Sequence, residues 1–451
     1  MSISEGRDIA ERAAPEVGSP ADGGRSFRRL AFASLVGSVI EGYDFGLYGV
    51  AAALVFPKVF FPSLGSAAAT VASLGTLGVA FVARPLGAIL FGHLGDRIGR
   101  RATLIATVLG IGLGTAFMGL IPPAASIGVA APILIILLRA VQGLALGGEW
   151  QGAALLVTEQ APRNRRGFYA MFPQLGASIP IALSALTLLI VSSAVDPDTF
   201  IAWGWRVPFL ASAPLVAVAL YIRLKVEETD AFVADRNRGK AASVPLFEAF
   251  KEQPGTILRS AGVALTTLTL VYVAQSFVAN YGVTHVGLSR NEVLVATMVS
   301  GFFYAGFTCL SAVLSDRMSR RVLIGGSHLV AVVWALLLFP LLNTGSFAAY
   351  IVGLCGSMAI AGLAYGGVAV FLPEQFPTRY RYTASGVAYQ ITGLLGGGLA
   401  PVLAPVVLAS SGSAALGYLL AGISVVAAAC TFSLKDKGKD SMDWSDARSG
   451  S

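Results

Sequence analysis

The stretch GHLGDRIGRR, residues 92–101, occurs a second time in altered form as AVLSDRMSRR, residues 312–321. A second pair repeats at nearly the same spacing, because TEQAPRNRRGFYAMFPQ, residues 158–174, is echoed by PEQFPTRYRYTASGVAYQ, residues 373–390. The two pairs of similar segments are separated by nearly the same number of residues, which indicates an internal duplication. The chain is therefore expected to consist of two similar halves.

The composition places these halves in a membrane. Hydrophobic residues make up 55% of the 451 residues and charged residues 13%, whereas about a quarter of the residues are charged in soluble domains. The three cysteines, Cys309, Cys355 and Cys430, have no paired or metal-ligand spacing. We expect an integral membrane protein without a disulfide framework, a metal site or another cofactor.

Apolar runs of about 20 residues, which suffice to cross a hydrocarbon core, predict an all-α fold of twelve transmembrane helices. The expected division is an N-terminal tail (1–28), a first six-helix bundle (29–222), a linker (223–259), a second six-helix bundle (260–433) and a C-terminal tail (434–451). The predicted spans are 29–55, 67–91, 102–121, 131–158, 167–193, 203–222, 260–282, 292–313, 322–342, 347–371, 382–408 and 414–433.

The distribution of Lys and Arg predicts the orientation. Most of the 32 Lys and Arg residues fall in the tails, the linker and the loops that share their side of the membrane. By the positive-inside rule, both termini and the linker are cytoplasmic, in the cytoplasmic (inner) membrane. Lys58, Arg206 and Arg290 fall on the opposite side, and Arg84 and Arg139 lie inside predicted helices. The net charge of +7 then reflects topology and contact with anionic lipid, and we expect no binding to nucleic acid.

Several stretches resemble a known family. GHLGDRIGRR matches the loop signature G-x-L-x-D-R-x-G-R-R of the major facilitator superfamily, and RAVQGLALGGEW, residues 139–150, resembles its helix-4 signature R-x-x-Q-G. SVIEGYDFGLYGVAAALVF (38–56), FVARPLGAILFGHLGDRIGRR (81–101) and PEQFPTRYRYT (373–383) more narrowly resemble the metabolite:proton symporter family, whose members carry shikimate, 2-oxoglutarate, citrate or proline and betaine. The chain departs from that family at Gly42, where Trp is usual, and at Ser319, where Gly is usual. The resemblance implies the major facilitator fold, with a substrate site between the halves.

Two carboxylates, Glu41 and Asp44, lie inside the first predicted span. An acidic side chain at the centre of a membrane helix costs about 3 kcal/mol, so its presence indicates a function. At 100° per residue both acids share one helix face with Tyr48, while Gly42, Gly46 and Gly49 form another face. We expect the glycine face to pack against a neighbouring helix and the acidic face to line the cavity, with Asp44 as the first candidate for a proton carrier and Glu41 as the second. The alternative is a static ion pair with an intramembrane arginine.

Arg84 and Arg139 offer planar forks of donors that suit a carboxylate, either of the substrate or of a nearby acid. Gln142 and Glu149 lie on the same side of their helix as Arg139, and Glu149 is the third candidate for proton coupling. Three acids against two arginines leave a negative cavity, which favours uptake of a carboxylate or zwitterion together with protons. The alternative is an internal brace between helices.

Uncharged polar side chains in the second half are candidates to bind substrate hydroxyls or to flank a ring. With Arg84, Arg139, Tyr48 and Gln142, they complete the predicted substrate site: Tyr272, Gln275, Tyr304, Tyr365, Tyr389 and Gln390. The alternative for the tyrosines is the general preference of this residue for membrane interfaces.

The repeated loop motif predicts a cytoplasmic gate. A surface charge cluster at this loop can hold the halves together while the cavity faces outward, and the resemblance implies the same role. The alternative is that these charges only set the topology. The candidate gating residues are Gly92, Asp96, Arg97, Gly99, Arg100, Arg101 and Glu159, with Asp316 and Arg317 in the second copy.

Together these patterns predict a monomeric secondary transporter that imports a small organic acid or zwitterionic metabolite with protons by alternating access. Proton-coupled efflux of a drug or metabolite is the alternative. A P-loop is missing, which excludes an ATP-driven pump, and no nucleophile or metal constellation of an enzyme is visible. The driving force is then a proton gradient.

Overall fold

The structure is a computed structural model that describes residues 20–98, 100–147, 161–224, 245–377 and 380–436. Within these ranges every regular element is a helix. The side chains of some helical residues, among them Glu41, Asp96 and Arg97, lie outside the described set. The prediction of an all-α chain is confirmed for the described residues.

The first half contains helices that follow its six predicted spans, with short helices in the connections. Their bounds are α1 (Pro20–Leu54), α2 (Phe56–Phe60), α3 (Ser66–Ile98), α4 (Arg100–Met118), α5 (Ala124–Ile127), α6 (Ala130–Leu146), the 3₁₀ helix η2 (Arg163–Arg165), α8 (Arg166–Ala194), α9 (Pro197–Thr199), the π-helix η3 (Phe200–Gly204), α10 (Arg206–Leu210) and α11 (Ser212–Leu224).

The second half also consists of helices, two of its runs being interrupted by π-helical turns. They are α13 (Pro245–Glu252), α14 (Pro254–Val263), α15 (Leu265–Tyr272), the π-helix η4 (Val273–Val278), α16 (Ala279–Thr284), α17 (Arg290–Ser315), α18 (Arg320–Leu342), α19 (Phe347–Glu374), α20 (Arg381–Thr392), the π-helix η6 (Gly393–Leu399) and α21 (Ala400–Ser433).

By length and apolarity, eight helical segments of the described chain are able to cross a membrane, and Ile105–Met118 and Ala130–Leu146 are shorter apolar helices. One of the eight, Arg381–Ser433, covers the last two predicted spans. Gly412 interrupts this run with φ 78°, a left-handed conformation that glycine adopts without steric cost. The break lies between the predicted spans 382–408 and 414–433.

The structure places some element boundaries differently from the sequence prediction. Helix α13 and the first turns of α14 occupy the second part of the stretch that was predicted as a linker, 223–259. Both helices begin with a proline, whose fixed φ suits the first helical position. The seventh spanning segment therefore begins at Pro254 and continues to Thr284.

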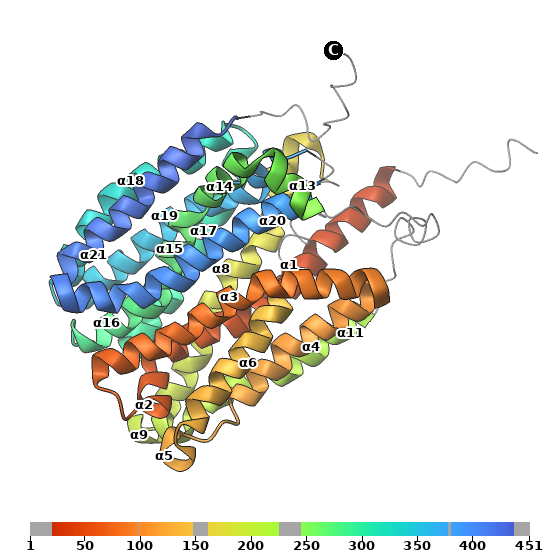
Figure 1. Cartoon of the computed structure of the whole chain (residues 1–451). Coiled ribbons are helices and arrows are strands. Elements are labelled where there is room, and N and C mark those ends of the chain that lie inside the picture. The colour runs from red at the N-terminus through yellow and green to blue at the C-terminus, as the bar shows by residue number, and fades with distance from the viewer. Residues whose placement is uncertain (1–19, 99, 148–160, 225–244, 378–379, 437–451) are drawn as a thin grey trace, which may run out of the picture.

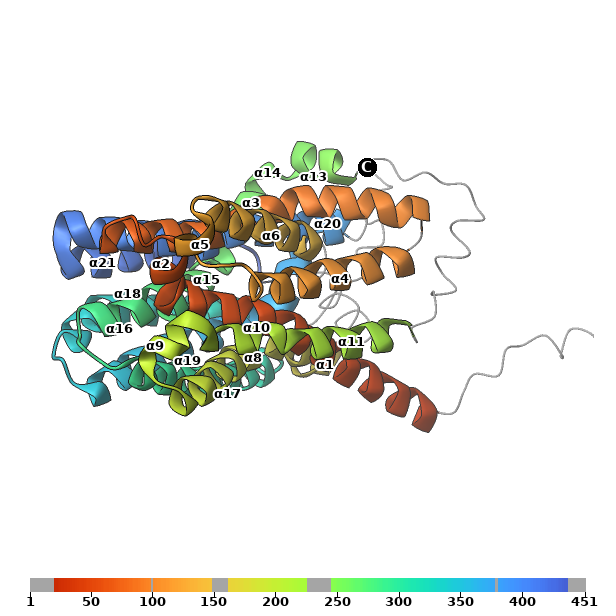
Figure 2. The same ribbon diagram turned by 90° about the horizontal axis from the view of Figure 1, so that it is seen from below.

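The helices form one bundle in which the two halves lie side by side, the first coloured red to yellow-green and the second green to blue (Figure 1). Helix α8 contacts α17 and α19 across the halves, α3 contacts η6, and α1 contacts η4. Helices α2, α5 and α9 gather at one end of the bundle, here named the α9 end (Figure 1). The other end, the α13 end, is where the first turns of α1 project beyond the bundle (Figure 2).

Glycine allows the two halves to approach closely. A Cβ atom added at Gly301 of α17 would lie 2.7 Å from the backbone nitrogen of Ala182 in α8. One added at Gly397 of η6 would lie 2.5 Å from the ring of Phe81 in α3. Small residues at such contacts maximise van der Waals packing, which is the main force between helices in lipid.

Candidate functional site

Helix α1 carries the acidic candidate Asp44 into the middle of the bundle. Asp44 is 5% exposed and Tyr48, one turn later, is 1% exposed. Glu41 belongs to α1, but its side chain lies outside the described set. The helix therefore buries a carboxylate and a phenol on the same face, as the sequence predicted for Asp44 and Tyr48.

The glycine face of α1 lies against the neighbouring helix α8. A Cβ atom added at Gly42 would lie 2.1 Å from the carbonyl oxygen of Gly176, and one at Gly46 would lie 2.9 Å from the hydroxyl of Ser184. The prediction that these glycines serve close packing is confirmed. Trp, the usual residue of the family at position 42, does not fit against α8 in this arrangement.

Arg139 is fully buried on α6 and stacks on two rings of α1. Its guanidinium carbon lies 4.0 Å from the ring centroid of Phe45 and 3.8 Å from that of Tyr48. Its Nη1 donates a hydrogen bond to Oε1 of Gln142, at 2.9 Å. A desolvated cation over an aromatic face gains about 2 kcal/mol, which offsets part of the cost of burial.

Gln142 orients Arg139. Its Oε1 accepts from Arg139, while its Nε2 donates to the carbonyl oxygen of Ile111 at 3.2 Å and to the hydroxyl of Thr115, both in α4. The amide of Gln142 is thus engaged at both ends. This geometry allows Gln142 to position Arg139, and direct contact of Gln142 with the substrate stays a prediction.

Arg84 of α3 sits in an aromatic cluster that joins the halves. Its guanidinium carbon lies 4.3 Å from the ring centroid of Phe81 and 4.6 Å from that of Phe45. Tyr272, from the second half, closes the cluster, with ring centroids 5.1 Å from Phe81 and 5.6 Å from Phe45. The hydroxyl of Tyr272 is within reach of the Arg84 guanidinium. The two intramembrane arginines therefore share Phe45.

The guanidinium groups hold hydrogen-bond donors that the described residues leave unused. Nε of Arg84, and both Nε and Nη2 of Arg139, are buried without an acceptor in the described part of the chain. Arg139 also experiences the charges of Arg84 and Asp44. Burying a guanidinium costs several kcal/mol unless acceptors satisfy it. An incoming carboxylate would supply both the acceptors and the negative charge.

Three polar candidates of the second half contact the first half. Gln275 donates from Nε2 to the carbonyl oxygen of Gly46 at 3.1 Å, and Gln390 donates from Nε2 to that of Gly147 at 2.9 Å. Tyr272 belongs to the Arg84 cluster described above. Oε1 of Gln390 is buried without a donor among the described residues. These residues line the contact between the halves, at the depth of the arginines.

The remaining three tyrosine candidates form a group of their own. The ring centroids of Tyr304 and Tyr365 lie 5.7 Å apart, and the hydroxyls of Tyr365 and Tyr389 lie 3.3 Å apart. All three are buried. Tyr389 lies within electrostatic range of Arg84. The structure thus brings these tyrosines, predicted singly from the sequence, together near the cationic cluster.

At the α13 end, the second copy of the loop motif joins the halves. Asp316 accepts hydrogen bonds from the backbone nitrogens of Gly167 at 2.7 Å and Phe168 at 2.8 Å, which open α8 in the first half. A carboxylate at a helix N-terminus is favoured by the unpaired N–H groups and the helix dipole. Arg317, the other predicted gating residue of this copy, is exposed.

Two further residues of this end were missed as site candidates. Arg320 donates from Nη1 to Oε1 of Glu374 at 2.6 Å and lies 3.9 Å from Asp316. Arg166 of α8 is within electrostatic range of Glu374, which brings a cation of the first half to the cluster. The repeat contained the signal, because Arg320 and Glu374 occupy the positions of Arg100 and Glu159 in the first copy.

The remaining predicted site residues lie outside the described residues or have side chains outside them. Among the described residues, no group of three or more His, Cys, Asp and Glu is arranged to hold a metal ion. The predictions not described by the structure are Glu41, Glu149, Gly92, Asp96, Arg97, Gly99, Arg100, Arg101 and Glu159.

Comparisons with known proteins agree with this architecture. Residues 34–401 match the family model of the Major Facilitator Superfamily. The crystal structure of a D-xylose-proton symporter superposes with a TM-score of 0.74 at 17% identity, covering 91% of this chain and 99% of that chain. At this identity the likeness concerns the fold, and it confirms the predicted major facilitator fold.

Two curated relatives from Escherichia coli (strain K12) are similar over most of their length. The inner membrane metabolite transport protein YhjE is 38% identical over 404 residues, 88% of this chain and 92% of the relative. The shikimate transporter is 38% identical over 413 residues, 89% of this chain and 93% of the relative. The protein is thus a multi-pass membrane transporter and not an enzyme. The chain belongs to the major facilitator superfamily, in the metabolite:proton symporter family that its motifs resemble.

Proposed function

We propose that the protein imports a small organic acid or zwitterionic metabolite together with protons by alternating access. The observation that supports this function best is the pair of arginines that share Phe45, Arg84 and Arg139, with three buried guanidinium nitrogens that lack an acceptor among the described residues. A substrate carboxylate accepts two such bonds in one plane, which a neutral substrate does not match. The carboxylate of Asp44, buried beside this pair, supplies a group that titrates.

The charges of the site connect substrate binding to protonation. Asp44 interacts electrostatically with Arg139, so a bound anion competes with the Asp44 carboxylate for the same cation. Protonation of Asp44 removes this competition and the repulsion between the two anions. Asp44 is therefore our proton carrier, with Glu41 as the residue that tunes it and Glu149 as the next candidate for the carrier. The tyrosine group and Tyr272 contact the uncharged part of the substrate.

The transport cycle needs two halves that move relative to each other. We propose that residues 29–222 and 260–433 act as these halves, joined by the linker 223–259. The Asp316 contact with the start of α8 locks them at the α13 end. From the distribution of Lys and Arg, the α13 end and both termini face the cytoplasm, and the protein acts in the inner membrane as a monomer, driven by the proton gradient without a cofactor.

A screen of organic acids with the purified protein in liposomes tests this function. With the outside more acidic than the inside, the vesicles should accumulate at least one of shikimate, citrate, 2-oxoglutarate, proline and glycine betaine above its external concentration. A protonophore should abolish accumulation but preserve exchange of internal for external substrate. If the acids only leave the vesicles against their gradient, the direction is efflux. If none crosses in either direction, the proposal is wrong.

A further inference from the structure

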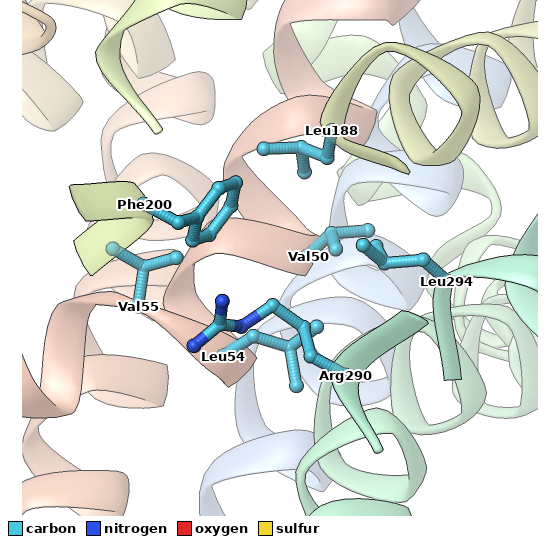
Figure 3. A pocket seen from close by; sticks show the side chains of 7 residues that line it. All are labelled: Val50, Leu54, Val55, Leu188, Phe200, Arg290 and Leu294. Carbon is cyan, nitrogen blue, oxygen red and sulfur yellow. The ribbon is translucent and has the colours of Figure 1, made fainter. Parts of the chain in front are cut away.

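Arg290 and Phe200 form a contact between the halves at the α9 end. Arg290 begins α17 in the second half, and its guanidinium carbon lies 4.4 Å from the ring centroid of Phe200. Phe200 begins η3 in the first half and is 1% exposed. The two side chains line a narrow pocket together with apolar residues (Figure 3): Val50, Leu54, Val55, Leu188 and Leu294.

This end of the bundle is closed. The space between the lining side chains has no room for a water molecule. Beside it, the hydroxyl of Ser192 donates to Oδ1 of Asn291 at 2.7 Å, and Nδ2 of Asn280 donates to the carbonyl oxygen of Ala53 at 2.9 Å. Both hydrogen bonds join the halves. A substrate that enters from the α9 end must therefore separate Arg290 from Phe200.

Arg290 differs from the other two cations predicted for this side. Lys58 is exposed, and Arg206 donates to the carbonyl oxygens of Ala202 at 2.6 Å and Ile121 at 3.0 Å. Arg290 is half-buried and, within the described chain, forms no ion pair with a carboxylate. Glu292, the acid next to it in sequence, accepts hydrogen bonds from the backbone nitrogen and hydroxyl of Ser289.

We propose that Arg290 and Phe200 form a latch that also selects anions. In the closed state the ring of Phe200 holds the guanidinium and with it the second half. When the halves part, the ring moves with the first half, and the guanidinium stays at the mouth of the opened cavity without a partner. A cation in that place concentrates anionic substrates at the entrance and repels cations. This inference rests on the proposed alternating access but not on proton coupling or on the identity of the substrate.

Cysteine labelling in lipid nanodiscs tests the latch without any substrate. The reporter is Val50→Cys, in a chain with Cys309, Cys355 and Cys430 replaced by Ala. The probes are two small thiol reagents of similar size, an anionic sulfonatoethyl and a cationic trimethylammonioethyl methanethiosulfonate. Phe200→Leu keeps apolar bulk but removes the ring, so both reagents should react about two- to fivefold faster than in the parent.

Arg290→Gln should change the preference between the two reagents. The ratio of anionic to cationic labelling should fall about fivefold at low salt and less at high salt, because the attracting charge is gone. Phe200→Leu and Arg290→Lys, which retain the charge, should keep the ratio of the parent. Ser63→Cys, on an exposed loop, reports the ratio of the two reagents in bulk solvent. A single symmetric peak in size-exclusion chromatography verifies that each variant is folded.

Two results would overturn the inference. An unchanged labelling rate in Phe200→Leu refutes the latch, and an unchanged reagent ratio in Arg290→Gln refutes the anion selection. If Arg290→Gln fails to fold, the labelling rate of Arg290→Lys still tests the latch. The selection is then tested in the parent, where high salt should remove the preference for the anionic reagent over the cationic one. A failure of the proposed transport function appears separately, as absent flux in the liposome screen.

Discussion

The two halves of the bundle bury different kinds of polar group. The first half buries full charges, since Arg139 and Asp44 are at most 5% exposed and Arg84 lies beside them. The described second half buries tyrosine and glutamine at the same depth, in Tyr304, Tyr365, Tyr389 and Gln275. At the α13 end, the described copy of the proposed gating motif belongs to the second half. The first half is thus suited to bind charged groups of a substrate. The second half is suited to contact its uncharged part and to hold the halves together at the α13 end.

Replacing Asp44 by Asn is the strongest test of this division. The variant imitates the protonated acid permanently, so it should bind substrate and cross the membrane loaded but fail to reset empty. We expect uptake driven by a pH gradient to fall by about 100-fold or more, while exchange of internal for external substrate continues. Flux of radiolabelled substrate in liposomes measures both.

Asp198→Asn, in the exposed short helix α9, is the matched control and should behave like the parent. Glu41→Gln should have a weaker effect than Asp44→Asn, or act through affinity. If Asp44→Asn accumulates substrate as the parent does, the proton carrier lies elsewhere in the first half, and Glu149 is the next candidate.

Arg84→Lys tests whether the cations of the first half recognise a carboxylate. A lysine keeps the charge but loses the planar fork, so binding of the acid should weaken about 10- to 100-fold, whereas binding of its neutral amide should change much less. Isothermal titration of the purified variant with both ligands measures the difference. Equal losses for the acid and the amide would identify Arg84 as a brace between the helices.

Asp316→Asn moves the test to the gate of the second half. The neutral amide loses the charge-assisted hydrogen bonds to Gly167 and Phe168, so the closed α13 end should be destabilised. We expect turnover to change about three- to tenfold with substrate affinity nearly intact, because the gate does not touch the substrate. Lys251→Gln, an exposed change at the same end, should leave turnover unchanged. Equal turnover in Asp316→Asn and the parent would reduce the motif to a signal for topology.

Tyr365→Phe should have the smallest effect. It removes the hydroxyl that lies 3.3 Å from that of Tyr389 and leaves the ring in contact with that of Tyr304. If the second half hydrogen-bonds the hydroxyls of the substrate, KM should rise about two- to tenfold with kcat unchanged. With a substrate that lacks hydroxyls, Tyr365→Phe should leave KM unchanged. A loss of kcat instead of affinity would show that the tyrosine group supports folding or movement.

The sequence by itself determined the properties that depend on local composition and periodicity. The shortage of charge identified a membrane protein, apolar runs predicted the spans, and the echo of residues 92–101 in 312–321 revealed the two halves. The phase of the helix also separated the acid Asp44 from the glycines, and α1 packs as that phase requires. The composition, the spans and the helix phase follow from residues close together in the chain, and the repeat follows from comparing two segments of sequence, so all are visible without the partner helices.

Only the tertiary structure decided which distant side chains meet. No spacing along the chain indicates that Arg84 and Arg139 share the ring of Phe45, or that Gln142 uses its amide on Arg139 and α4. The repeat predicted Asp316 as a candidate residue but did not indicate its partners, which are the backbone nitrogens at the start of α8. Arg290 was visible only as a cation on the opposite side, until the packing of α17 against the first half placed it on Phe200. The physical reason is that close packing of small residues sets how one helix is shifted and rotated against another. If a helix slides along its partner by one turn, each of its side chains contacts different residues.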